Sequence, residues 1–540
     1  MKIKTQYIVL GAAILISLIP ILYNPFFVTL DGPSHLYNAR LLLDFVTQRN
    51  LDFWNIYYRV NPMPDTNWFS HLALGALLPL FKPFAAERIL QALYVILFIL
   101  ASYLLVSSLN KKYSYGYLAL LPFVYNHTFQ MGFYNYSFGV VFMMLSLWLY
   151  LSRHNFKSYI FYPAAILLFF ETYLAHLIGF MLLVGALSLY LTFETFLGQA
   201  QGDFTFYAKT LFKKGLKLLL VSLPGLLLVA KFFYDRRGIA PTPSDYQFSG
   251  LSSLLLSCSC LITVTSVEQF LTTGIFISLV VWVSWALWTK FKNKDLRADD
   301  SFLIIAAALF IFYYKQPGSV AGAGIVPQRV LLLPFLFITL WVCSVDRNVY
   351  ANKLFSALFA VMAILLFSVR MPILSKSSDL VSEILTCQPY ISERSTVLAL
   401  DYAPNGIAPD GNMIADRIWM YFHIPDYLGA VKPLVMLNNY EANISYFPVN
   451  WQNGAEPFHA LSKCNDGIQE HPPCVNLMGY KSEKHKDVNY VLLIGLTDPK
   501  TIGHPNTQDL LKQLSDNHYE LIYTSANKRA KLYHLLILPV

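Results

Sequence analysis

The sequence predicts a mainly α-helical membrane protein that crosses the bilayer about eleven times and carries a small α/β domain at its C-terminal end. Of its 540 residues, 56% are hydrophobic and only 13% are charged, whereas a soluble domain carries roughly 25% charged residues. Apolar stretches long enough to span a bilayer recur over residues 1–370. Charged, proline, asparagine and glycine residues become frequent over residues 371–540, and no further span appears there.

The charge pattern indicates cytoplasmic loops and argues against a nucleic-acid partner. The formal net charge is +8, but Lys and Arg fall in short clusters between the apolar stretches, which is typical of cytoplasmic loops. The sequence has no basic stripe with interleaved aromatic residues. We therefore expect a lipid bilayer, and no nucleic acid, among its partners.

The first span, residues 7–28, sets the orientation. Lys2 and Lys4 precede it, and its apolar run is too long for the core of a signal peptide and lacks a cleavage motif. We expect an uncleaved helix with a cytoplasmic N-terminus, so that the chain emerges on the outer side at residue 29.

A long outer loop, residues 29–84, follows the first span. Residues 34–46 and 65–81 have apolar residues at helical spacing, with Trp, Tyr and His at the polar edges. Both are predicted to be helices that lie in the plane of the interface.

Ten more spans are predicted after this loop, and the Lys and Arg clusters fall on the inner side at every second turn. The spans are expected at 86–109, 117–125 and 137–151, twice within 159–195 with a turn near Glu171, before the outer sequence KFFYDRRG, at 270–289 and 301–314, from about residue 329, and at 354–369.

Residues 371–540 are predicted to form one extracytoplasmic α/β domain. Residues 488–496 read as a strand, and a helix, a strand, a turn at 525–527 and a last strand follow. On an oxidising side of the membrane, Cys464 and Cys474 are expected to form a disulfide. The other four cysteines lack zinc-site spacing, and no metal is assigned to them.

The stretch TLDGPSH, residues 29–35, is the first candidate functional site. It places Asp31 at a membrane surface, directly before a helix-start signal that includes Pro33. His35 follows one helical turn later, on the same face. A carboxylate beside an imidazole at the membrane edge suits acid–base chemistry on a lipid-borne substrate. The alternative is that Asp31 only caps a helix.

Ionisable residues at membrane depth are costly and suggest function. Glu171 and His176 lie in an otherwise apolar stretch. Glu171 is either a second acid of the site, with His176 beside it, or a residue that caps the outer turn. Arg329 follows the small-residue loop GSVAGAG at the outer start of a span, where a guanidinium suits a bidentate phosphate contact. Lys315, at the other end of that loop, and Arg237 are further candidates for phosphate binding; snorkelling to lipid phosphates is the alternative for Arg237.

The second interfacial helix carries candidates for binding a sugar or an acceptor. Asn67, Trp68 and His71 lie within about one turn of one another, and Asp65 precedes them. A sugar ring can stack on Trp68, although anchoring of an aromatic residue at the interface explains it equally well.

These features resemble the GT-C superfamily of integral-membrane glycosyltransferases, which includes protein O-mannosyltransferases and lipid A aminoarabinose transferases. The matching features are Asp31 in TLDGPSH, the long first outer loop with interfacial helices, the multi-span core, the outer C-terminal domain, and a late outer loop that leads into Arg329 in GAGIVPQR. The C-terminal segments YVLLIGL and YELIYTSANKRAKLYH look like the tails of many bacterial members.

The resemblance implies inverting transfer of a sugar from a polyprenyl-phosphate donor to a lipid, glycan or protein acceptor. The reaction would occur at the outer face of a bacterial inner membrane, with the C-terminal domain in the periplasm. Asp31 would be the general base, and Arg329, with Lys315, would hold the donor phosphate.

One departure from the family concerns the loop between the third and fourth spans. Many relatives carry an acidic motif there, but this chain reads NHTFQMGFYNYS, without a carboxylate. Glu171 or Asp65 substitutes for it, or the chain has lost activity. The missing carboxylate also weakens the case for a divalent metal, and no cofactor is expected.

Two other classes of function compete with the enzyme. A transporter or flippase for a lipid-linked substrate would carry ionisable residues along mid-membrane helices and repeated halves; here the charges gather on one face and no repeat is evident. A non-catalytic scaffold protein with the same fold stays open because of the missing acid.

Overall fold

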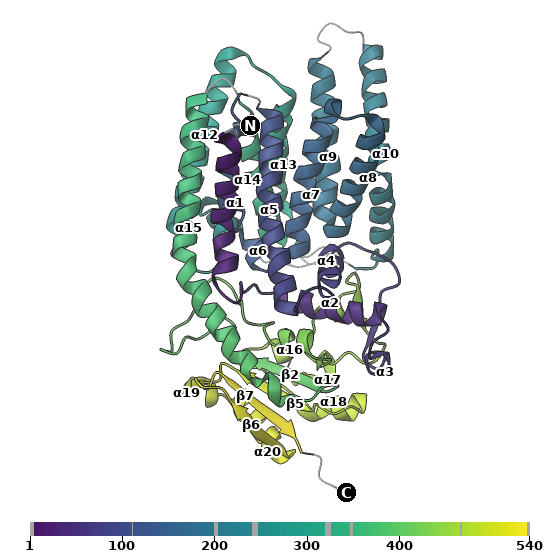
Figure 1. The fold of residues 1–540 in the computed structure, drawn as a ribbon, viewed down its shortest axis with the longest axis vertical. Helices are drawn as coiled ribbons and strands as arrows, with labels where there is room; N and C mark the ends of the chain where they lie inside the picture. Colours follow the sequence, from purple (N-terminus) through teal and green to yellow (C-terminus); the bar gives the residue numbers. More distant parts are fainter. Residues whose placement is uncertain are drawn as a thin grey trace.

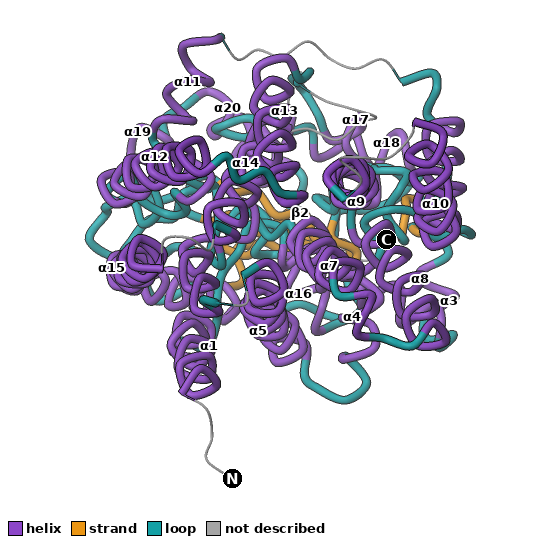
Figure 2. The backbone as a smooth tube through the Cα atoms, turned by 90° about the horizontal axis from the view of Figure 1, so that it is seen from above, coloured by secondary structure: helices purple, strands orange, loops and turns teal. Residues whose placement is uncertain are grey.

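The structure is a computed structural model that describes residues 5–110, 112–198, 204–239, 247–318, 326–345, 349–464 and 467–536. A bundle of long helices forms one end of the molecule, and a sheet with short helices forms the other (Figure 1). In the view along the bundle, the strands lie beneath its middle (Figure 2). The predicted fold class, mainly helical with a small C-terminal sheet region, is confirmed.

Nine helices of the described residues are long and apolar enough to cross a membrane. They are α1 (Thr5–Tyr23), α5 (Pro83–Leu109), α7 (Tyr134–Leu151), α8 (Ser158–Ala175), α9 (Leu177–Leu197), α10 (Phe204–Asp235), α12 (Glu268–Asn293), α14 (Val326–Ser344) and α15 (Val349–Ile384). Two shorter elements, η1 (Ser114–Phe123) and α13 (Ser301–Lys315), occupy the places of the other two predicted spans. The chain is therefore a multi-pass membrane protein.

The break between α8 and α9 lies at His176, five residues beyond the turn predicted near Glu171. α8 continues through Glu171 to Ala175, and His176 is extended, with φ −159° and ψ 128°. Its Nδ1 accepts a hydrogen bond from the backbone N–H of Ile178 at 3.2 Å. The break therefore lies where His176 caps α9, and the hydropathy of the sequence does not reveal such a contact.

The first outer loop fills the space between the bundle and the sheet region. Its helices α2 (Gly32–Val46) and α4 (Phe69–Leu77) lie across the end of the bundle, and α2 packs against α16 (Asp426–Val431) (Figure 1). Its strand β1 (Tyr58–Val60) pairs antiparallel with β4 (Val449–Trp451). Residues almost 400 positions apart thus form one layer.

Five strands form the C-terminal sheet, in the order β3-β2-β5-β7-β6. β2 is parallel to β3 and β5, whereas β7 is antiparallel to β5 and β6. The strands are β2 (Thr396–Asp401), β3 (Val435–Met436), β5 (Tyr490–Ile494), β6 (Tyr519–Thr524) and β7 (Ala530–Leu535). With α20 (Pro505–Asp516) between β5 and β6, the predicted order of strand, helix, strand, turn and strand is confirmed.

Short elements complete the outer part. They are α3 (Leu51–Trp54), α6 (His127–Gln130), α11 (Phe248–Leu256), η3 (Ser259–Leu261), η6 (Glu441–Asn443), α17 (Phe458–Leu461), η7 (Gly467–Gln469), α18 (Leu477–Lys484) and α19 (Pro499–Ile502).

The last membrane helix, α15, runs directly into the outer part. It continues to Ile384, so the domain boundary expected at residues 370–371 falls inside it. Near its end, the Glu383 carboxylate accepts hydrogen bonds from Ser525 Oγ at 2.6 Å, the Asn527 backbone N–H at 2.9 Å and Arg529 Nε at 2.7 Å. The turn between β6 and β7 is thereby attached to the helix.

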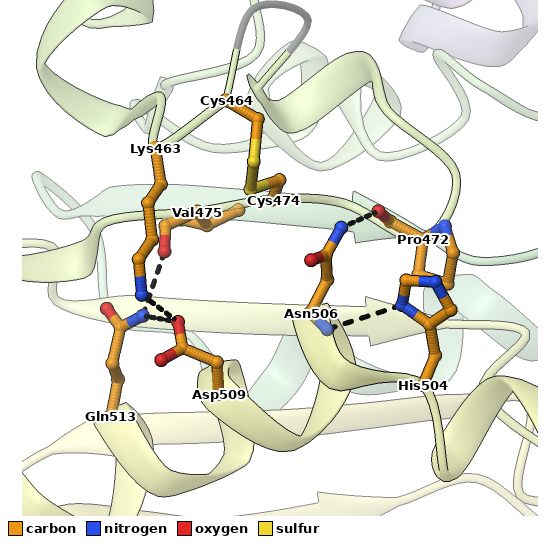
Figure 3. The surroundings of a disulfide bond; sticks show 9 residues. All are labelled: Lys463, Cys464, Pro472, Cys474, Val475, His504, Asn506, Asp509 and Gln513. Carbon is orange, nitrogen blue, oxygen red and sulfur yellow. Dashed lines mark hydrogen bonds and ion pairs between the residues drawn. A yellow bond between two sulfur atoms is a disulfide. The ribbon is translucent and has the colours of Figure 1, made fainter.

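The expected disulfide joins Cys464 to Cys474 (Figure 3). Beside it, Lys463 Nζ pairs with Asp509 Oδ2 at 2.8 Å, and Gln513 Nε2 donates to the Val475 carbonyl at 2.8 Å, so that this loop is attached to α20 (Figure 3). The other four cysteines are free and buried.

A buried ion pair joins α12 and α15. Arg370 Nε lies 2.8 Å from Glu268 Oε2, and both side chains are at most 4% exposed. The other guanidinium nitrogens donate to the carbonyls of Tyr125, at 3.0 Å, and Leu261. The Glu268 carboxylate also accepts hydrogen bonds from the backbone N–H groups of residues 263–265. Every polar group of the pair is thus satisfied, which a buried ion pair requires.

Removing one member of this pair should strongly destabilise the protein. Arg370→Met leaves the Glu268 charge buried without its partner, at a cost of about 3–5 kcal/mol. Thermal unfolding in detergent should show a lower midpoint, and the double variant with Glu268→Gln should recover part of the loss. Lys231→Met, which breaks an ion pair with both side chains about 40% exposed, should leave the midpoint unchanged. If Arg370→Met is as stable as the parent protein, the proposed role of the buried ion pair is wrong.

Candidate functional site

A cavity of about 470 Å³ lies between the end of the helical bundle and the C-terminal region. Side chains from the first outer loop, the bundle and the C-terminal region meet in its wall. Its polar lining residues are Asp31, His35, Asn67, Asn135, Tyr136, His176, Arg329, His423, Tyr440, Tyr446, Gln469 and His471. Five of the residues singled out in the sequence, Asp31, His35, Asn67, His176 and Arg329, are among them.

Backbone contacts hold Asp31, so its carboxylate is not needed to start the helix. Asp31 is the N-terminal cap residue of α2, but its side chain makes no capping hydrogen bond. Its backbone N–H donates to the Met131 carbonyl at 3.1 Å, and the Leu30 N–H donates to the Gln130 carbonyl at 3.2 Å. These contacts, together with Pro33 in the first turn, start the helix without the carboxylate. The alternative that Asp31 serves only to cap the helix therefore lacks support, because its side chain makes no capping hydrogen bond.

Gly132 makes this close approach of two chain segments feasible. Its φ is +74°, in the region that favours glycine. A Cβ atom at residue 132 would lie 2.6 Å from the Asp31 nitrogen and 2.7 Å from the Gly32 nitrogen. The loop between the third and fourth predicted spans thus lacks a carboxylate but supplies the backbone that holds Asp31.

The environment of Asp31 raises its pKa into the range of a base near neutral pH. Burial raises the pKa of this carboxyl to about 6, although His35 and a hydrogen bond from Tyr440 act in the opposite direction. His423 Nε2 lies 3.8 Å from Asp31 Oδ1. Burial also lowers the pKa of His423 to about 3, so this imidazole is neutral. A general base works best when its pKa lies near the operating pH.

Arg329 supplies a positive charge to the same cavity. Its guanidinium lies over the Phe133 ring, 4.3 Å from the centroid, and its Nε has no hydrogen-bond partner among the described residues. The Arg329 carbonyl accepts a hydrogen bond from Tyr136. Residues 319–325, most of the small-residue loop before it, lie outside the described residues. A half-buried guanidinium whose Nε is unpaired suits an anionic ligand.

Other residues singled out in the sequence lie away from the cavity lining. Asp65 pairs with Arg236 at 2.8 Å and accepts a hydrogen bond from Tyr173. Trp68 Nε1 donates to the Tyr446 carbonyl at 2.9 Å. Arg237 is exposed and covers the Tyr234 ring. Lys315 is exposed at the end of α13, and Glu171 is half-buried in α8.

His71 meets His35 at a carboxylate that sequence reasoning missed. His71 Nε2 lies 2.7 Å from Glu441 Oε2, and His35 Nδ1 lies 2.6 Å from Glu441 Oε1. Burial raises the pKa of Glu441, but the two imidazoles more than offset this effect and lower it to about 2. Burial lowers the pKa of His35, and Glu441 more than offsets this, so that the pKa is raised overall.

The residues that sequence reasoning missed come mostly from the C-terminal region. His423, Tyr440, Glu441 and His471 lie in a polar part of the chain, where ionisable residues are common. No spacing relates them to Asp31. Only His471 has an indirect signal in the sequence, because it lies between Cys464 and Cys474, the two cysteines expected to form a disulfide.

Substitution of Gly132 should test whether backbone contact positions Asp31. Gly132→Ala places a Cβ against two backbone nitrogens at positive φ, and we expect a destabilisation of about 1–3 kcal/mol and displacement of Asp31. Thermal unfolding in detergent should show the loss. Gly185→Ala is the matched control, since a Cβ there meets nothing within 4 Å. Equal stability of the two variants would contradict this account.

Comparison with known proteins supports the fold. No family model and no curated protein matches the chain. Its structure is similar to that of apo ArnT from Cupriavidus metallidurans, with a TM-score of 0.50, 14% sequence identity, and coverage of 98% of this chain and 97% of that one. A second similar structure, the apo oligosaccharyltransferase of Archaeoglobus fulgidus, has a TM-score of 0.44 and 13% identity, with 90% and 69% coverage. The chain therefore shares its fold with the ArnT structure over nearly its whole length.

Proposed function

We propose that the chain is a membrane glycosyltransferase that transfers a sugar from a polyprenyl-phosphate donor to an acceptor hydroxyl at the outer face of a bacterial inner membrane. The observation that carries the proposal is that one cavity is lined both by Asp31, a buried carboxylate that caps no helix, and by the half-buried guanidinium of Arg329. The likeness of the fold to that of ArnT supports the proposal.

In the proposed reaction, the acceptor hydroxyl attacks the anomeric carbon from the face opposite the phosphate. Asp31 takes the hydroxyl proton as the new C–O bond forms. The bond between the anomeric carbon and the phosphate oxygen breaks with its electron pair on that oxygen, and the configuration inverts. Arg329 binds the phosphate and stabilises the charge that develops on it.

The surroundings of the two residues fit these roles. Tyr440 hydrogen-bonds to the Asp31 carboxyl and orients it. Phe133, Phe447 and Tyr446 give the cavity apolar walls that exclude water and can pack against a sugar ring. The acceptor, whether a lipid, a glycan or a protein, presents only its hydroxyl to this site.

Asp31→Asn should abolish most of the transfer while leaving the protein folded. A positioned general base contributes about 10²–10⁴-fold, and we expect turnover to fall by that factor. The assay uses proteoliposomes with labelled polyprenyl-phosphate sugars and extracted membrane acceptors. Asp52→Asn removes an exposed carboxylate of the same outer loop and should keep full activity.

Full activity of Asp31→Asn would remove Asp31 from the chemistry. Parent protein that moves the labelled lipid across the bilayer without covalent change would replace the proposal with transport. Folded parent protein without transfer or transport, from donors that a control enzyme uses, would favour a scaffold.

Arg329→Gln should weaken donor binding and also slow the transfer step. Losing a charge-assisted contact worth about 1.5–3 kcal/mol should raise the KM for the donor by roughly 10–100-fold. Arg237→Gln is the matched control, because Arg237 is exposed and lies outside the cavity lining. If Arg237→Gln raises the KM and Arg329→Gln does not, the phosphate binds elsewhere.

A further inference from the structure

Three buried side chains from separate parts of the chain converge beside the cavity. His35 comes from α2, His71 from α4 and Glu441 from η6. Their exposed fractions are 3%, 0% and 0%. One donor atom from each lies within 4.8 Å of the others. The cluster is a place where two segments of the first outer loop meet the C-terminal region.

The contacts within this cluster differ from an ordinary hydrogen-bonded triad. His71 Nε2 and Glu441 Oε2, 2.7 Å apart, have hydrogen-bond geometry. His35 Nδ1 and Glu441 Oε1 are only 2.6 Å apart, yet neither atom has a hydrogen-bond partner in acceptable geometry. Three donor atoms that lie this close together in a buried site have the spacing that ligands of one ion can have.

We propose that His35, His71 and Glu441 bind a divalent transition-metal ion, with zinc as the best fit. Two imidazole nitrogens and one carboxylate oxygen form a recognised zinc donor set, with bonds of about 2.0–2.2 Å. Magnesium and calcium prefer oxygen ligands, and a site with two histidines disfavours them. Binding requires the donors to separate by roughly 0.6 Å from their present contacts, toward the spacing of a tetrahedral site.

Aromatic rings pack around the cluster. The His35 ring packs against His71 and Tyr134, with centroids 5.0 and 5.7 Å apart, and Phe447 covers both imidazoles. No Lys or Arg forms an ion pair with Glu441 among the described residues. The two imidazoles are therefore its charge partners, and a cation between them would neutralise the buried carboxylate.

A second group of potential ligands, Cys464, Glu470 and Cys474, is a poorer site. Its two cysteines are joined in a disulfide and have no thiolates to offer. It provides the control for the experiment.

The ion would join the outer loop to the C-terminal region. It would link α2, which starts at the Asp31 cap, to α4 and to the segment that carries Tyr440. Asp31 itself is outside the donor set. The site thus differs in its residues from the proposed chemistry, and it can exist whether or not the chain transfers a sugar.

Metal content of the purified full-length protein tests the proposal directly. The protein is stripped with a chelator in detergent, exposed to Zn²⁺, desalted and analysed by mass spectrometry for bound metal. We expect one zinc ion per chain. With Co²⁺ instead, we expect the visible d–d absorption of a low-symmetry site that carries nitrogen and oxygen ligands.

Variants locate the ion. Glu441→Gln and His71→Ala should each weaken zinc binding by more than about 100-fold, beyond the 10–100-fold effect of outer-shell partners. The double variant Cys464→Ser with Cys474→Ser, and His127→Ala, which alters a histidine that contacts the Ile262 carbonyl, should bind zinc like the parent.

Three outcomes would overturn the proposal. Folded parent protein that takes up neither zinc nor cobalt would leave the cluster as a hydrogen-bonded triad. Parental zinc binding by both ligand variants would exclude these residues, and loss of zinc in the cysteine double variant would place the ion at the second group. If the ligand variants fail to fold, the parent's metal content and cobalt spectrum still decide the question.

Discussion

The buried ion pair between Arg370 and Glu268 is the interaction on which the position of the candidate site depends. Arg370 holds the carbonyl of Tyr125, directly before α6, and Glu268 orders the backbone of residues 263–265. The end of α6 in turn presents the Gln130 and Met131 carbonyls to the first outer loop. A continuous series of contacts thus runs from the last membrane helix to Asp31. Because backbone atoms complete this series, the Asp31 side chain has no structural task and remains available for chemistry.

The helical bundle could be predicted from the sequence because its cause is local. A stretch of about 20 apolar residues must form a helix in a bilayer, and the Lys and Arg clusters give its direction. The strands around residue 490 and the turn at 525–527 were equally legible from their alternating pattern. The break at His176 and the extension of α15 to Ile384 were not, because a cap and the attachment of Glu383 to the β6–β7 turn are contacts formed only in the folded chain.

The site was accessible from the sequence only on its membrane side. Asp31, His176 and Arg329 attracted attention because an ionisable residue is unusual beside hydrocarbon. In the polar C-terminal region the same residue types carry no such signal, so His423, Tyr440 and Glu441 passed unnoticed. Their positions in and beside the cavity wall depend on the packing of α2 against α16 and on the β1–β4 pair, both of which join segments almost 400 residues apart. Asp65 illustrates the same difficulty, since its partner Arg236 lies in a different helix.

The continuity of α15 also bears on how large a substrate can be. The helix leaves the bundle and ends under the sheet, where Glu383 is attached to the β6–β7 turn, while β1 and β4 join the two parts elsewhere. Within the described residues 349–464, α15 passes from the bundle into the outer part without a break. The cavity of about 470 Å³ thus lies between two parts of the molecule that are joined to each other. In the proposed reaction, the size of this space limits the part of the acceptor that can reach Asp31, whatever the size of the molecule that carries the hydroxyl.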